Sequence, residues 1–181
     1  MADVEGVICG RIHVLLGTGP DFARMQSICV AANVPSLAMI IGPGELGVHG
    51  LITRVPSRDA AHEAMGHLRD LGRARPGQVI HLDADDVADF VVRARSVQSE
   101  AVVLKHRGKT LVDATRGVVA GLAGRIVLDA VVQVCVGSEV SVGDINAAME
   151  MLDPSGFTAF GLRRSTADRR PSSLTVFGMV R

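Results

Sequence analysis

Residues 99–124, SEAVVLKHRGKTLVDATRGVVAGLAG, decide the expected fold of the second half of this chain. The apolar VVL triplet predicts a strand over residues 100–106. Gly108 suits the positive φ that a tight hairpin turn requires, so a second strand is expected over 109–114. The small residues that follow predict a short helix beginning at Thr115. A hairpin that runs directly into a helix is an uncommon arrangement, and the flanking segments fit around it.

Segments on both sides of this hairpin extend it into a folded unit. The pattern predicts strands over 79–82 and 130–137, and a last helix after Ser141, which forms a capping-box pattern with Asp144. A further helix is expected over 83–97, with Asp83 as its N-cap. Its apolar residues recur at helical spacing and are expected to face inward: Val87, Phe90, Val91 and Ala94.

The first 72 residues predict a comparable unit. A strand is expected over 5–17, then a helix over 21–34, then a hairpin of strands 36–41 and 48–55 around the glycine-rich GPGELG. Ser57 caps a second helix. The two expected inward faces are Phe22, Met25, Cys29 and Ala32 on the first helix, and Ala61, Ala64, Met65, Leu68 and Leu71 on the second. This order predicts two helices on one face of an antiparallel sheet.

The expected fold class is therefore α+β, with two open-faced sheet-plus-helix sandwiches. Residues 1–72 form the first domain, 73–78 a linker marked by Gly72 and Pro76, and 79–153 the second domain. Residues 154–181 contain two further strand-like runs and are expected to form a C-terminal β-ribbon that completes a sheet.

The first unit resembles the ACT domain family, whose folds are ferredoxin-like. The stretch VLLGTGPDFARMQSICVAANVPS looks like that family's first strand, ligand loop and helix. Pro20 and Asn33 match the family pattern, whereas Asp21 stands where a glycine is usual. The resemblance implies a small regulatory domain that binds a metabolite in the loop after the first strand.

The second unit resembles the HPr phosphocarrier family. KHRGKTLVDATRGVVAGLA is similar to that family's hairpin and regulatory-site helix, with Thr115 at the position of the regulatory serine. An ungapped alignment places Ala84 where the family has its phosphorylated histidine, and aspartates surround it. Because alanine supplies no nucleophile and the aspartates repel phosphate, the resemblance implies a degenerate member that accepts no phosphoryl group there.

Composition excludes several classes of partner. Lys plus Arg and Asp plus Glu balance at 19 each, and aromatic residues make up 3% of the chain, so no nucleic-acid partner and no membrane partner are expected. No apolar run reaches about 18 residues. Three widely spaced cysteines are typical of reduced core thiols, which indicates a cytoplasmic protein.

Two glycine-rich loops are the candidate ligand site. Free amides at the start of the first helix favour a carboxylate, and a facing flap could close over it. The expected ligand is an amino acid or similar metabolite, since the Asp21 charge disfavours a phosphate ester, and an ordinary turn is the alternative for each loop. The seven candidate residues are Gly17, Thr18, Gly19, Asp21, Gly44, Glu45 and His49.

No other cluster predicts chemistry. The histidines have no metal-ligand spacing, so no metal and no cofactor are expected. No nucleophile and base can be paired by spacing, so no catalytic residue is predicted. The acidic group at 83–89 is interpreted as a solvated helix start, and the basic group at 163–170 as a solvated loop.

These observations favour a non-enzymatic cytosolic regulatory or ligand-sensing protein, acting as a homodimer that binds a small metabolite and partner proteins. One alternative is a phosphotransferase-system carrier or regulator. A second is a self-assembling structural protein, because small α/β units with apolar edges oligomerise readily. An enzyme with a dispersed active site is also left open.

Overall fold

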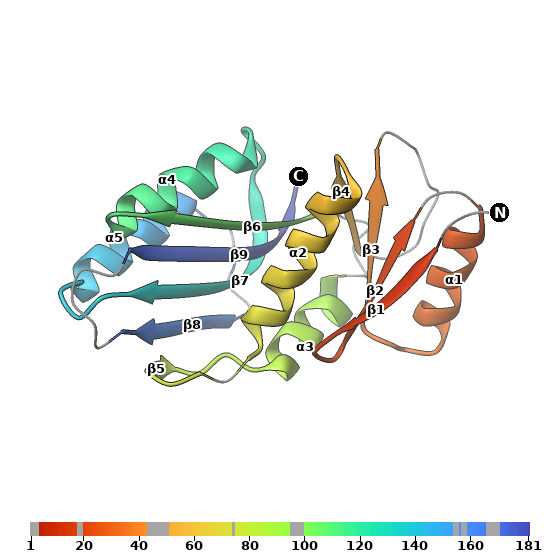
Figure 1. Cartoon of the computed structure of the whole chain (residues 1–181), viewed down its shortest axis with the longest axis horizontal. Helices are drawn as coiled ribbons and strands as arrows, with labels where there is room; N and C mark the ends of the chain where they lie inside the picture. The colour runs from red at the N-terminus through yellow and green to blue at the C-terminus, as the bar shows by residue number, and fades with distance from the viewer. Residues whose placement is uncertain are drawn as a thin grey trace.

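The computed structural model describes residues 4–17, 20–42, 51–73, 75–94, 100–153, 156, 159–165 and 171–181. Within those residues, nine strands form one mixed sheet in the order β1-β2-β3-β4-β6-β9-β7-β8-β5, with five helices against it (Figure 1). The expected mixture of helices and strands is confirmed. The expected pair of separate sandwiches is wrong, because β4 and β6 pair through Ile52 and Glu100 and join both halves into the same sheet.

The elements follow one another along the chain with few long connections. The strands are β1 (Glu5–Cys9), β2 (Ile12–Gly17), β3 (Ser36–Ile41), β4 (Leu51–Val55), β5 (Gln78–Ile80), β6 (Glu100–Gly108), β7 (Val127–Val136), β8 (Ala159–Arg164) and β9 (Ser172–Val180). The helices are α1 (Pro20–Ala31), α2 (Arg58–Leu71), α3 (Ala84–Ala94), α4 (Leu111–Leu122) and α5 (Val142–Leu152).

The first half of the sheet differs from the expected pattern in strand direction. The single strand expected over 5–17 is a β1–β2 hairpin, because Gly10 turns the chain with a φ of 63°. The hairpin expected over 36–55 is absent, since β3 and β4 are parallel, and a tight turn cannot join parallel strands. The nearly continuous burial of β3 fits this arrangement, because parallel strands are covered on both faces.

The stretch that opens the second half also folds differently. β6 runs through to Gly108, and the segment expected as a second strand is the first turn of α4. Thr110 and Asp113 form a capping box: each backbone N–H donates to the other residue's side-chain oxygen at 3.1 Å. This cap satisfies two amide donors at the helix start and outweighs the strand propensity of the Leu111-Val112 pair.

Strand β9 lies at the centre of the second half. It pairs antiparallel with β6 on one side and with β7 on the other, which confirms that residues 173–180 form a paired strand (Figure 1). The expected ribbon instead separates into two strands, since β8 pairs with β7 and β5 and not with β9. The domain boundaries at residues 72 and 79 stay a prediction.

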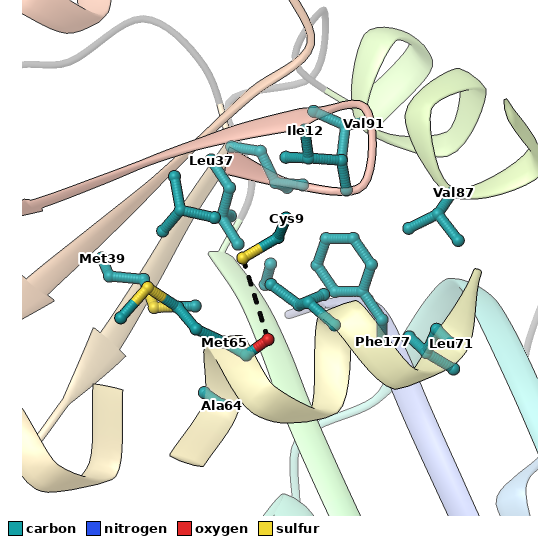
Figure 2. Packing of buried hydrophobic residues seen from close by; sticks show 14 of the residues in the cluster. Cys9, Ile12, Leu37, Met39, Ala64, Met65, Leu71, Val87, Val91 and Phe177 are labelled. Atoms are coloured by element: carbon teal, nitrogen blue, oxygen red, sulfur yellow. Dashed lines mark hydrogen bonds between the residues drawn. The ribbon is translucent and has the colours of Figure 1, made fainter. Parts of the chain in front are cut away.

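Helices cover both faces of the sheet. α2 and α3 pack on one face, where residues of both halves share a core that includes Leu37, Met65, Val91 and Phe177 (Figure 2). On the other face, α4 and α5 pack over β6, β7 and β9, and α1 packs over β2 and β3. In Figure 2 the Cys9 thiol points to the Met65 carbonyl oxygen, to which it donates at 3.8 Å.

The predicted inward faces are confirmed for α2 and α3, and the one predicted for α1 is wrong at Met25 and Ala32. All five apolar residues expected on α2 are buried, and so are the four expected on α3. α1 instead buries Gln26 completely, while Met25 is 36% exposed. Cys29 of the predicted face is partly buried against the cluster of Leu15, Ala38 and Ile40, and the side chain of Phe22 is not described.

Truncating Phe177 tests the joint core. Its ring is fully buried and packs edge-on against Phe90 with centroids 4.8 Å apart. We expect Phe177→Ala to lower the free energy of unfolding by about 3–5 kcal/mol, measured by urea denaturation at low protein concentration. Ile126→Ala, at a side chain 51% exposed, is the control and should change it by less than about 0.5 kcal/mol. Equal effects of the two variants would contradict a shared core.

Candidate functional site

The sheet opens between β4 and β6. These parallel strands pair only through Ile52 and Glu100 among the described residues, and beyond that point they diverge (Figure 1). A pocket of about 280 Å³ lies in the opening and is lined by side chains from both faces of the sheet. It lies on the side toward which both strands run, where α/β sheets commonly bind ligands.

One flank of α2 supplies the polar wall of this pocket. Glu63 and His67 lie one turn apart, and the His67 Nε2 is 3.5 Å from the Glu63 Oε1. Asp70 follows on the same flank, and the Lys105 Nζ of β6 lies 3.4 Å from its Oδ2. The buried apolar stripe of α2 fixes this flank, because it holds the helix against the core and turns these residues toward β6.

Electrostatics favour a neutral imidazole in this pocket. Burial lowers the pKa of His67, the positive charge of Lys105 lowers it further, and the carboxylates of Glu63 and Asp70 oppose both. Thr53 of β4 also lines the pocket, and its buried Oγ1 has no hydrogen-bond partner in the described part of the chain. A neutral imidazole and an unpaired hydroxyl suit hydrogen bonding to a polar ligand.

This pocket was not predicted from the sequence. The only local signal is the spacing of Glu63, His67 and Asp70, which places three polar residues on one flank of an otherwise apolar helix. His62, five residues earlier on α2, is exposed, whereas His67 faces the pocket. The contributions of Thr53 and Lys105 depend on pairing between distant strands.

The seven predicted ligand residues stay a prediction. Gly17 ends β2 beside Ile40 of β3, and because the two strands are parallel, the chain leaves both at the same edge of the sheet. The side chain of Asp21 is not described, and the others lie outside the described residues: Thr18, Gly19, Gly44, Glu45 and His49.

The Asp83 carboxylate accepts hydrogen bonds from the backbone amides at the start of α3. The backbone N–H groups of Asp85 and Asp86 donate to the Asp83 Oδ1 at 2.8 and 3.0 Å, which confirms Asp83 as the cap. These bonds, that of Asp86 first, lower the pKa of Asp83. A carboxylate therefore occupies the amides that a phosphate would need beside Ala84.

The remaining candidate groups from the sequence are the basic group at 163–170, the three cysteines and possible metal ligands. Arg164 donates from Nη2 to the Val140 carbonyl oxygen at 2.7 Å, so this arginine of the basic group has a structural contact, while Arg169 and Arg170 lie outside the described residues. The three cysteines are free, and burial raises the pKa of the Cys9 thiol. Across the residues that the structure places, no three His, Cys, Asp or Glu side chains could hold a metal ion. No helix in that part of the chain is long and apolar enough to cross a membrane.

The comparisons with known proteins come from structure alone. No protein-family model and no curated protein matches the sequence. The fold is similar to TubZ of Bacillus thuringiensis serovar israelensis, solved as GDP-form protofilaments, with a TM-score of 0.57, 11% identity and coverage of 93% of this chain and 61% of that one. The fold is also similar to CetZ of Methanosaeta thermophila, with a TM-score of 0.55, 11% identity and coverage of 94% of this chain and 62% of that one. For an FtsZ dimer of M. jannaschii the TM-score is 0.50, with 12% identity and coverage of 87% of this chain and 58% of that one.

These likenesses show a shared fold. The chain spans about three-fifths of the length of the proteins it matches. The resemblances to the ACT and HPr families are therefore wrong, and so are the metabolite-sensing interpretation and the phosphotransferase alternative that rested on them. Both resemblances followed the local order of helices and strands, which the parallel β2–β4 segment and the central β9 do not preserve.

Replacing His67 tests the lowered pKa. Unfolded imidazole takes up a proton near its ordinary pKa of 6.5, whereas the folded side chain does so at lower pH. The unfolded state thus binds more protons in that interval, and stability falls as the pH drops from 6.5 through the folded pKa. We expect His67→Gln to lose less stability than wild type between pH 7.5 and pH 5. The measurement is the free energy of unfolding in urea, repeated at intervals of about half a pH unit.

The matched control is His62→Gln, on the exposed side of the same helix. It should follow the wild-type pH dependence more closely than His67→Gln does. Superimposable pH profiles for all three proteins would show that the His67 environment does not disfavour protonation.

Proposed function

We propose that this chain is the subunit of a self-assembling protein polymer. The observation behind the proposal is the fold that it shares with TubZ, solved as protofilaments, and with FtsZ, solved as a dimer. Of the functions considered from the sequence, the self-assembling structural protein is the one that this likeness supports. It also retains the expectation of a homo-oligomer.

The two ends of the sheet support assembly in one direction. The sheet ends at β1 on one side and at β5 on the other, and neither strand has an outer partner in the described part of the chain. Each of these edge strands exposes apolar side chains: Ile8 is 64% exposed on β1, and Val79 and Ile80 are 63% and 44% exposed on β5. Unpaired edges with exposed apolar residues favour association with another strand.

The difference between the two edges favours a filament over a closed dimer. A contact between unlike surfaces is heterologous, so β1 of one subunit against β5 of the next leaves one free edge of each kind. Addition can then repeat without closure. The expected homodimer becomes the first step of that series.

Edge-directed substitutions test the proposal. Ile8→Lys and Val79→Lys each place a charge on one edge, and each should abolish long assemblies in sedimentation velocity and negative-stain electron microscopy. An equimolar mixture of the two variants should stop at dimers, because the β5 edge of the first and the β1 edge of the second are intact. Val142→Lys, at a side chain 69% exposed on α5, is the control and should assemble like wild type.

Two results would contradict this assembly. A wild type that stays monomeric across the concentration series removes the polymer itself. Edge variants that assemble as well as Val142→Lys leave polymerisation in place and exclude the edges as its contacts.

We also propose that a guanine nucleotide binds where the chain leaves β2 and β3. The TubZ structure is a GDP form, and the parallel direction of the two strands supports a common edge for the loops that follow them. Glycines permit close approach of backbone amides to phosphate groups. This proposal replaces the amino acid that the charge of Asp21 had favoured with a nucleotide. Its binding residues are those of the predicted site: Gly17, Thr18, Gly19, Asp21, Gly44, Glu45 and His49.

Calorimetric titration with GDP tests this site. We expect Gly19→Val to weaken GDP binding at least roughly tenfold, because a side chain there blocks approach of the phosphates. Gly66→Val is the matched control, since nothing lies within 4 Å of a Cβ at that position on α2, away from both edge strands. Absence of GDP binding to wild type would overturn the nucleotide site without touching the assembly experiment.

A further inference from the structure

The face of the sheet that carries α2 and α3 is apolar only over part of its area. Near the middle of the sheet, Phe177 and Val131 lie opposite each other in register and belong to the core beneath those helices. Farther along the same strands, side chains on this face become polar. Figure 1 shows that the strands of the second half extend well beyond α2 and α3, while α4 and α5 cover their opposite face.

The strand register aligns these polar residues in two rows. The outer row runs across four strands and has an arginine at each end: Arg107 on β6, Ser173 on β9, Cys135 on β7 and Arg163 on β8. The inner row lies two residues closer to the core: Lys105, Thr175, Gln133 and Gly161. Residues two apart on a strand face the same side of a sheet, so both rows face the side of α2.

A pocket of about 280 Å³ lies over these rows. Asp70 at the end of α2 and Arg75 just beyond it form one wall. Thr175 is 4% exposed and Gln133 is 7% exposed, so the polar floor is well enclosed. The inner row ends where Leu82 covers Gly161, since a Cβ at Gly161 would lie 2.7 Å from the Leu82 Cβ.

The pocket carries an excess of positive charge. Among the described residues, Arg75, Lys105, Arg107 and Arg163 line it together with one carboxylate, Asp70. Arg75 and Lys105 both bind that carboxylate, Lys105 at 3.4 Å. Arg107 and Arg163 form no ion pair within the described part of the chain. Within the described lining, four cations against one anion leave three positive charges unbalanced.

We propose that this pocket binds a small multivalent phosphate anion. Arg107 and Arg163 belong to strands three spacings apart, about 14 Å, so two extended guanidinium groups can converge from opposite sides. Guanidinium forks bind phosphate oxygens in pairs. The hydroxyls of Ser173 and Thr175 and the amide of Gln133 lie between them as further donors.

The lining also limits the kind of ligand. Its described apolar members are Val136 and Pro171, and none of its described lining residues is aromatic, so this lining offers no platform for a base. The volume of about 280 Å³ is just below the usual range of small-molecule sites. A chain of two or three phosphoryl groups fits both limits, whether it is free or the phosphate end of a nucleotide. This site is separate from the nucleotide edge proposed after β2 and β3.

Binding of inorganic tripolyphosphate to the full chain tests the proposal. We expect one site per chain by calorimetry, weakened roughly 100-fold in Arg107→Gln/Arg163→Gln, which removes two charge-assisted contacts. Arg24→Gln/Arg116→Gln removes the same charge from exposed positions on α1 and α4 and should bind within about threefold of wild type. No binding by wild type, or equal losses in both double variants, would overturn the site.

Thiol protection provides a readout that needs no variant. Cys135 lies in the outer row between Ser173 and Arg163 and is partly exposed, and Cys29 on α1 is partly exposed on the opposite face. Saturating tripolyphosphate should slow alkylation of Cys135 by iodoacetamide and leave the rate at Cys29 unchanged. Equal rates at Cys135 with and without the anion would contradict binding over this row.

GTP distinguishes the two sources of the phosphate chain. If a nucleotide supplies it, GTP should compete with tripolyphosphate and should protect Cys135 in Gly19→Val as it does in wild type. If only the free anion fits, GTP should leave Cys135 unprotected. Failure of the nucleotide edge would appear as GDP binding that Gly19→Val leaves unchanged in the Arg107→Gln/Arg163→Gln background, where this pocket no longer contributes to binding.

Discussion

The structure depends on the position of β9 between β6 and β7. Its backbone pairs with both neighbours over most of its length, and Phe177 extends from it into the core beneath α2 and α3. Without this strand, β6 and β7 would not belong to the same sheet, and α4 would pack over an open gap. The pocket proposed to bind phosphate also depends on β9, because this strand contributes Ser173 and Thr175 to its floor, between the cations of β6 and β8.

Helix α2 connects the structural and chemical features of the molecule. Its buried stripe packs on both halves of the sheet, and one polar flank supplies Glu63, His67 and Asp70 to two adjoining pockets. Lys105 lines both pockets and binds Asp70, so a charge bound in one pocket influences the electrostatics of the other pocket. The environment of His67 reflects this arrangement, since burial and Lys105 act together on its pKa.

Short sequence patterns predicted the helix caps correctly, but they could not predict which distant segments pair as strands. Asp83, Ser57 and Ser141 each cap a helix as expected, because a cap is decided within four residues. The direction of β3 against β4 depends on a crossover, and the glycines between them are equally compatible with a hairpin. The pockets could not be predicted for the same reason: they combine α2, β4 and β6, or four strands in register, which only the assembled sheet brings together. The glycine-loop site remains a prediction.

The central place of β9 has a consequence for refolding. Strands β6 and β7 precede it in the chain, so a partly folded molecule presents two facing unpaired edges one strand-width apart. The β9 of another copy has the same sequence and fits that slot equally well, with the same register on both sides. The topology therefore permits strand exchange between copies, and we expect rapid refolding at high concentration to produce interlocked dimers beside monomers.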